Sequence, residues 1–85
     1  MSVWIVLVDC ITDGEGGSFI YSVSKAEDDG VEAFERYKKG DAIPLCLEKG
    51  WFVYEDAPDE YDCGSTDDYL YNHIRVTLHN ISLEG

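Results

Sequence analysis

The residues most able to do chemistry in this sequence are the carboxylates that gather between residues 55 and 68. Between Trp51 and Ile74 there is no lysine or arginine. A group of carboxylates without neighbouring bases creates a negative field that attracts cations and basic protein surfaces. This stretch is therefore the first candidate for a functional site. Its acids are Glu55, Asp56, Asp59, Glu60, Asp62, Asp67 and Asp68.

The other residue types that bind metals do not form a recognisable motif. The zinc-type ligands are widely separated and include no C-x-x-C pair, which a zinc site usually contains. The acids between Asp59 and Asp67 do not fit the calcium-loop pattern D-x-[DN]-x-[DN]-G-x5-E. We therefore expect no metal and no cofactor. The zinc-type ligands are Cys10, Cys46, Cys63, His73 and His79.

Enzymatic chemistry has little support in the sequence. Cys63 and His73 could act as nucleophile and base, but acidic neighbours favour the protonated thiol, the opposite of what a nucleophile needs. A catalytic carboxylate pair needs a pocket that raises one pKa, and a small sheet with one helix rarely forms a deep pocket. The glycine-rich residues 13–18 contain no lysine and do not begin a helix, so they are not a phosphate loop. We predict that the protein is not an enzyme.

Length and composition predict one folded domain over residues 1–85. A hydrophobic content of 45% is enough to build one core. The apolar run near the N-terminus is too short to cross a membrane, and no bases precede it as they would in a signal peptide. Three cysteines at wide spacings predict no disulfide framework. We therefore expect reduced thiols and a cytoplasmic protein.

The apolar pattern predicts the element order β-β-α-β-β-β. Residues 3–12 are apolar on both alternating faces, and a glycine-rich turn joins them to a second strand, so they begin a β-hairpin. Pro44 places the third strand at an edge or makes it irregular. A phase shift near His79 and Asn80 indicates a bulge or a bend in the last strand. The remaining segments are strands over 19–23, 42–47, 51–54 and 73–83, an acidic loop over 56–68 and a helical turn over 67–71.

The segment from Lys25 to Lys39 has the apolar spacing of a helix, with acids in its first half and bases at its end. Ser24 and Glu27 match a capping box, and Gly40 is suited to end the helix. Gly30 weakens the helix interior by about 1 kcal/mol relative to Ala, which indicates a close contact there. We predict an α+β fold in which one helix packs on one face of an antiparallel sheet of about five strands.

The net charge is the strongest indication of function. The chain has 18 acids and 6 bases, which gives -12 on 85 residues, and such an excess destabilises a compact state. Carboxylates repel nucleic acids and anionic membranes, so we expect neither as a direct partner. Carboxylates at i and i+2 on a strand lie about 6.6 Å apart, and a row of them presents a field similar to that of DNA phosphates.

In size, acidity and compactness, though in no motif, the chain resembles the small phage-encoded inhibitors such as anti-CRISPR proteins and DNA mimics. The resemblance implies that its partner is a protein with a basic nucleic-acid-binding groove, which the acidic segment blocks. Tyr61 and Tyr69 join the seven acids in the predicted surface, because exposed tyrosines are common at protein interfaces. Arg75 is either an interface anchor or part of a solvated sheet face. The alternative function is a generic cytosolic interaction module or a homodimer whose acidity serves solubility.

Overall fold

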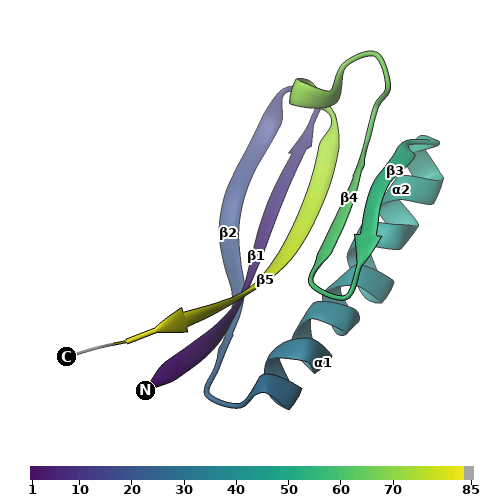
Figure 1. The fold of residues 1–85 in the computed structure, drawn as a ribbon. Helices are drawn as coiled ribbons and strands as arrows, with labels where there is room; N and C mark the ends of the chain where they lie inside the picture. Colours follow the sequence, from purple (N-terminus) through teal and green to yellow (C-terminus); the bar gives the residue numbers. More distant parts are fainter. Residues whose placement is uncertain (84–85) are drawn as a thin grey trace.

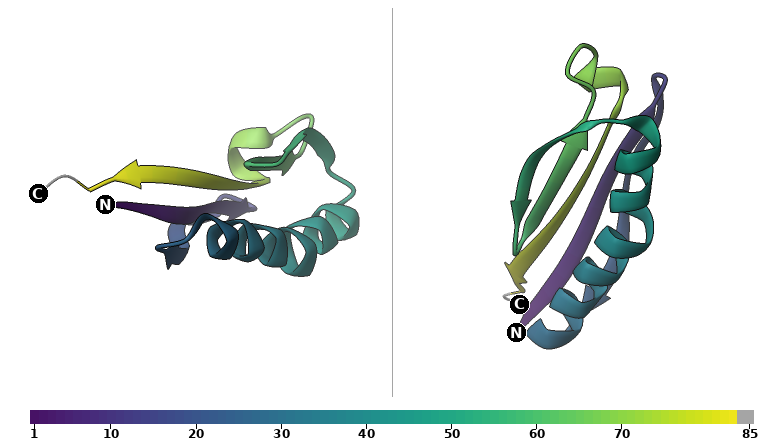
Figure 2. Two further views of the ribbon diagram at one scale, coloured as in Figure 1. Left: turned by 60° about the horizontal axis from the view of Figure 1, so that its bottom comes forward. Right: turned by 90° about the vertical axis from the view of Figure 1, so that its right-hand side faces the viewer.

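In the computed structural model, which describes residues 1–83, one helical segment covers one face of a five-stranded antiparallel sheet (Figures 1 and 2). The strand order is β2-β1-β5-β4-β3, and the expected α+β fold is confirmed. Within residues 1–83, no helix has the length and apolar character needed to span a bilayer. The elements are β1 (Ser2–Thr12), β2 (Glu15–Ser24), α1 (Glu27–Tyr37), a π-helical turn η1 (Lys38–Ala42), α2 (Ile43–Lys49), β3 (Phe52–Ala57), β4 (Glu60–Gly64), a 3-10 turn η2 (Tyr69–Tyr71) and β5 (His73–Ser82).

The predicted hairpin of β1 and β2 is confirmed. Its turn uses Asp13 and Gly14, with φ angles of 53° and 79°, and two positive φ values match the twist of a tight hairpin. β1 also pairs with β5 without interruption from Ser2 opposite Ser82 to Ile11 opposite His73. Of the two alternatives predicted near His79 and Asn80, a bulge or a bend, the bulge is therefore wrong, because the pairing with β1 has no register shift there. The irregularity lies between β1 and β2 instead.

The helical segment continues past its predicted end at residue 39 and reaches residue 49. The chain passes Gly40 inside η1 and continues directly into α2, so the predicted strand over 42–47 is wrong. Pro44 is the second residue of α2, directly after the π-helical turn, and proline in a helix interior removes one backbone hydrogen bond. Buried Ala42 and Cys46 continue the apolar face, and this burial outweighs the local helix-breaking signals. The helix ends at Gly50, which has a left-handed φ of 66°.

The capping box predicted for the helix start is also wrong. Ser24 remains in β2 and pairs with Trp4 of β1, so it is not placed to cap the helix. Ala26 occupies the N-cap position in an extended conformation, and no side chain caps the helix there. The acids of the first turn, Glu27, Asp28 and Asp29, instead complement the partial positive charge at the helix N-terminus.

β4 lies inside the segment that was expected to be an acidic loop. Its residues alternate between the two faces: Tyr61 and Cys63 are buried, and Glu60 and Asp62 are less buried. This two-residue period is that of a strand with one face on a core. β3 also extends beyond the predicted 51–54, and runs from Phe52 to Ala57. The expected number of strands is correct because β4 replaces the strand wrongly placed at 42–47.

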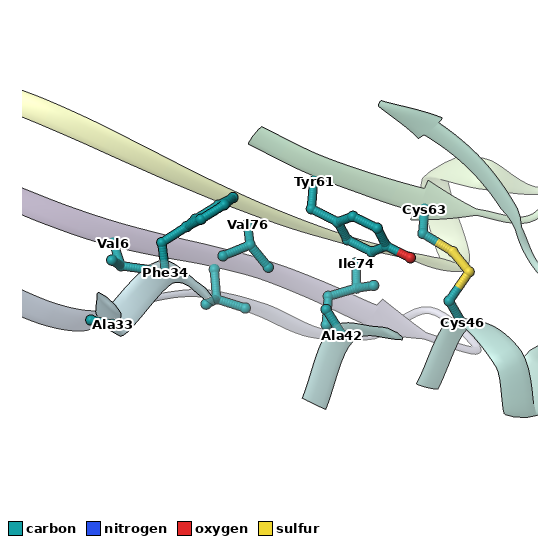
Figure 3. Packing of buried hydrophobic residues seen from close by; sticks show 10 residues of the cluster. Val6, Ala33, Phe34, Ala42, Cys46, Tyr61, Cys63, Ile74 and Val76 are labelled. Carbon is teal, nitrogen blue, oxygen red and sulfur yellow. A yellow bond between two sulfur atoms is a disulfide. The ribbon is translucent and has the colours of Figure 1, made fainter. Parts of the chain in front are cut away.

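The core lies between the sheet and the helix (Figure 3). Phe34 of α1 packs against the alternate residues of the central strands, and all of these side chains are almost fully buried. The predicted close contact at Gly30 is confirmed, because a Cβ added there would lie 2.7 Å from the Cβ of Trp4. The central strand residues of the core are Val6, Val8, Ile74 and Val76.

A disulfide between Cys46 and Cys63 joins α2 to β4 inside this core (Figure 3). The expectation that all three thiols are reduced is therefore wrong, and only Cys10 is free. Cysteine spacing did not indicate the pair because the two residues meet only after the helix has continued to residue 49. Since Cys63 is in a disulfide, it cannot act as the nucleophile of a Cys63–His73 pair.

Removing the disulfide should destabilise the protein. The bond closes a loop with a sequence separation of 17, and a loop of that length contributes about 3 kcal/mol by restricting the unfolded chain. We expect the double variant Cys46→Ala/Cys63→Ala to lose about that much free energy of unfolding in urea titrations. Dithiothreitol should lower the stability of the wild type and leave the double variant unchanged. Cys10→Ala, which keeps the disulfide, should remain sensitive to dithiothreitol; equal stability of the double variant and the wild type would contradict the assignment.

Two glycines of the helical segment should respond oppositely to alanine. Gly30→Ala should lower the free energy of unfolding by roughly 1–3 kcal/mol, because the clash with Trp4 exceeds the gain in helix propensity. Gly40→Ala is the matched control, since an added Cβ meets nothing within 4 Å there, and it should stabilise the protein by up to about 1 kcal/mol. Urea titrations measure the free energy of unfolding of both variants. A Gly30→Ala variant more stable than the wild type would contradict the close contact.

Candidate functional site

The acidic excess is concentrated on the sheet and its loops. Residues 25–49, which contain the helix, carry five bases and seven acids, a net charge of -2. All remaining residues carry eleven acids and one base, Arg75, a net charge of -10. Because the helical segment covers only one sheet face, most of the negative field arises from the other layer of the molecule.

Charged residues cross the uncovered sheet face in one row. Arg75 of β5 lies between Asp9 of β1 and Asp62 of β4, and Asp62 in turn lies opposite Glu55 of β3. The guanidinium also contacts Glu60, with 3.2 Å between Nη2 and Oε2. A base between acids offsets the repulsion that neighbouring like charges would otherwise cause. This structural role accounts for Arg75, which the sequence left open between an interface anchor and a solvated residue.

Asp9 belongs to a hydrogen-bonded network around His73 that no motif in the sequence indicates. His73 is buried, and its Nε2 lies 3.0 Å from Oδ2 of Asp9 while its Nδ1 lies 2.8 Å from the carbonyl oxygen of Tyr69. The hydroxyl of Ser18 donates to the other oxygen of Asp9 at 3.1 Å. Both ring nitrogens of His73 thus lie within hydrogen-bond distance of an oxygen atom. Asp9 is therefore engaged internally.

Tyr69 links this network to the predicted acidic segment. Its ring stacks on His73 with 4.6 Å between ring centres, and its hydroxyl donates to Oδ1 of Asp62 at 2.5 Å. Partial burial and the bond to Asp62 raise the pKa of the Tyr69 hydroxyl. The hydroxyl therefore remains protonated and keeps donating to Asp62. Both residues have a structural role on the uncovered face.

Two further members of the predicted surface lie on the helix side of the sheet. Tyr61 was expected to be exposed, but it is 3% exposed and forms part of the core (Figure 3). The carboxylate of Asp56 lies 2.6 Å from Nζ of Lys38, and the same amine lies 5.6 Å from the ring centre of Tyr61. Bases from outside the segment, Lys38 and Arg75, thus partly neutralise acids that looked unopposed in the sequence.

Four of the seven predicted acids are exposed and form no ion pair within residues 1–83, and the structure divides them into separate groups. Asp59 lies in the turn between β3 and β4, whereas Asp67 and Asp68 follow β4 at its other end. The five residues of β4 place these positions roughly 17 Å apart. Glu55 lies on β3 between them. The acids do not form the single regular row that the sequence predicted.

A long-range contact adds two further acids to the group at residues 67–68. The N–H of Gly14 donates to the carbonyl oxygen of Tyr71 at 3.0 Å, and the N–H of Asp13 donates to Oδ1 of Asn72 at 3.0 Å. These bonds hold the β1–β2 turn beside η2 at one end of the sheet (Figure 1). No local pattern in the sequence indicates this contact. We call the four acids at this end the acidic end: Asp13, Glu15, Asp67 and Asp68.

The hydroxyl of Ser65 fixes the loop of the acidic end. It accepts hydrogen bonds from the backbone N–H groups of Asp67 at 3.2 Å and Asp68 at 3.1 Å. The loop is further tied by the Ser65 N–H, which donates to the carbonyl oxygen of Asn72 at 2.9 Å. Because the backbone is held from several directions, the chain that carries the two carboxylates has a defined position before any partner binds.

Within residues 1–83, no group of three or more His, Cys, Asp or Glu side chains is placed to hold a metal. A shallow depression of about 240 Å³ on the uncovered face is lined in part by Leu7, Arg75 and His79. Partial burial, together with Asp9, raises the pKa of the free Cys10 thiol, which disfavours its reactive thiolate form.

Comparison with known proteins adds no functional information. No protein-family model matches this sequence, and no curated protein or solved structure resembles it significantly.

Tyr69 should be among the last tyrosines to ionise. In a spectrophotometric titration, Tyr69→Phe should remove a tyrosinate step well above pH 10, because burial and Asp62 raise the pKa of Tyr69. The control Tyr71→Phe removes an exposed ring. Since the raised pKa belongs to the folded state, the stabilising effect of the bond is present below about pH 10 and disappears as pH rises through that pKa. A Tyr69→Phe variant that loses a step near pH 10 would contradict the bond.

Proposed function

We propose that the protein binds and blocks a cationic nucleic-acid-binding site on another protein and that it does so without catalysing a reaction. The observation that carries the proposal is the charge distribution: -10 on the residues outside 25–49, most of which form the sheet and its loops, against -2 on residues 25–49. A field concentrated on one layer attracts and orients a basic partner, whereas evenly spread charge serves mainly solubility. The resemblance to small phage-encoded inhibitors in size and acidity points to the same function.

The proposed contact uses the exposed acids that have no internal ion pair within residues 1–83. Nucleic-acid-binding grooves present Lys and Arg to phosphates, and their affinity falls steeply as salt rises. Carboxylates held on a folded scaffold can occupy such a groove. Glu60 and Asp62 have the i and i+2 spacing of phosphate mimics, but Arg75 and Tyr69 engage them. We therefore propose that the protein matches the field of a nucleic acid rather than the position of each phosphate.

A cytoplasmic location remains part of the proposal, because proteins that act on nucleic acids in a bacterial host are cytoplasmic. The Cys46–Cys63 disulfide would then meet reducing conditions. Its two cysteines are 4% and 0% exposed, so a reductant reaches the sulfurs only when the core opens locally.

Neutralising exposed acids at two different places tests the proposal. One variant carries Asp13→Asn, Glu55→Gln, Asp59→Asn, Asp67→Asn and Asp68→Asn on the sheet side. The matched control carries Asp28→Asn, Asp29→Asn, Glu32→Gln, Asp41→Asn and Glu48→Gln within the helical segment. Both changes bring the net charge from -12 to -7, so only the location of the removed charge differs. Thermal melting verifies that each variant is folded.

The readout is displacement of labelled DNA or RNA from a panel of nucleic-acid-binding enzymes, CRISPR effectors included. We expect the wild type and the helix control to displace nucleic acid from at least one enzyme. Added salt should strongly weaken this displacement. The sheet-side variant should lose about tenfold or more in apparent affinity, a factor that corresponds to about 1.4 kcal/mol. Equal inhibition by the two variants, or displacement that is insensitive to salt, would contradict the proposal.

A further inference from the structure

The two edges of the sheet differ in how well they are protected from pairing with another strand. β3 is six residues long, contains Glu55 and Asp56, and is followed by Pro58. Short length, charge and proline are the usual means of protecting an edge. β2 is ten residues long and contains no lysine, arginine or proline, and its only charged residue is Glu15. Within residues 1–83, β2 pairs only with β1, so its outer backbone groups are free to pair with another strand.

β2 also exposes large apolar side chains. Phe19, Ile20 and Val23 are 47%, 58% and 59% exposed. Ile20 lies opposite Leu7 and Val23 lies opposite Ile5 on the neighbouring strand, so the apolar surface continues onto the uncovered sheet face. A continuous apolar surface beside an unpaired strand edge is typical of a protein interface.

The charge distribution indicates which partner fits this edge. A cationic protein would gain little there, because β2 has one acid and the nearby Asp9 is bonded to His73 and Ser18. Two copies of a chain with a net charge of -12 repel each other over most of their surfaces. The repulsion is weakest where both approach through β2. The edge therefore favours a second copy of this chain over a basic partner.

We propose that β2 pairs with β2 of a second copy in antiparallel orientation, which joins two five-stranded sheets into one continuous sheet. A twofold axis makes such an interface self-complementary, and strand addition satisfies backbone N–H and C=O groups on both copies. A register centred on Ile20 places Glu15 of each copy opposite Lys25 of the other. Glu15 and Lys25 are both exposed in the single chain, so this register adds two attractive charge pairs. It also brings the two Ile20 side chains together and places Val23 opposite Gly17 of the other copy.

This inference does not depend on the proposed function. Edge pairing engages Glu15 but leaves accessible all five acids that the sheet-side variant of the proposed function neutralises: Asp13, Glu55, Asp59, Asp67 and Asp68. A chain that fails to inhibit any nucleic-acid-binding enzyme can still dimerise, and a monomeric chain can still inhibit one. The two proposals are therefore tested by separate measurements.

The test is the molar mass in solution, measured by sedimentation equilibrium from low to high micromolar concentration. We expect the wild type to approach twice its chain mass as concentration rises. Ile20→Lys/Val23→Lys should weaken dimerisation by more than about 30-fold, the factor of an interface hot spot. The control Leu47→Lys/Leu70→Lys makes the same charge change at apolar side chains that are 77% and 76% exposed elsewhere, and it should dimerise at least as well as the wild type.

A charge exchange tests the register and does not depend on apolar substitutions being tolerated. Glu15→Lys and Lys25→Glu should each weaken the dimer, because each places like charges opposite each other across the twofold axis. The double variant should restore the affinity of the wild type, since it only exchanges the partners. A wild type that remains monomeric throughout the concentration range would overturn the proposal. A dimer that is as stable with Ile20→Lys/Val23→Lys as without them would also overturn it. The same holds if the double variant Glu15→Lys/Lys25→Glu does not restore the affinity.

Discussion

The continuity of the helix from residue 27 to residue 49 is the constraint on which the rest of the structure depends. Because η1 passes Gly40 without ending the helix, the chain reaches the far strands of the sheet. There Cys46 of α2 is bonded to Cys63 of β4, and Lys38, two residues before Gly40, binds Asp56 of β3. One helix covers one sheet face only, so the same continuity leaves the other face open to solvent and to partners. The length of the helix thus determines how far the core extends along the sheet. It also determines which sheet face, with its charged residues, stays uncovered.

The parts of the fold that sequence could predict are those specified by neighbouring residues. The hairpin follows from alternating apolar residues and a turn that needs positive φ angles. The close contact at Gly30 follows from a glycine on an apolar helix face. The helix continuation, the acidic strand β4 and the disulfide could not be predicted in this way. At Gly40 and Pro44 the local signals favour a break, and the burial of Ala42 and Cys46 outweighs them. Residues 56–68 likewise contain so many charges that the alternation of buried and less buried residues in β4 could not be recognised in the sequence.

The sequence predicted that the candidate site is acidic, but the structure changes which residues belong to it. The sequence indicated where acids gather along the chain, but their neutralisation depends on bases that come from other elements. Arg75 and Lys38 bind two of the acids, and the hydroxyl of Tyr69 binds a third. Asp13 joins the site only because the β1–β2 turn is bonded to the loop before β5. The segment from residue 55 to residue 68 is therefore partly a structural network and partly an exposed charged surface.

The central claim is that a basic partner meets the sheet side of the molecule and not the helix. The most direct measurement is a two-dimensional NMR titration of the isotopically labelled protein with an arginine-rich peptide at moderate salt. Because a polycation follows the strongest negative field, we predict that the shifts concentrate at the acidic end and around Glu55 and Asp59. Shifts that are equally large at Asp28 and Asp29, or that spread evenly over all exposed carboxylates, would contradict the claim.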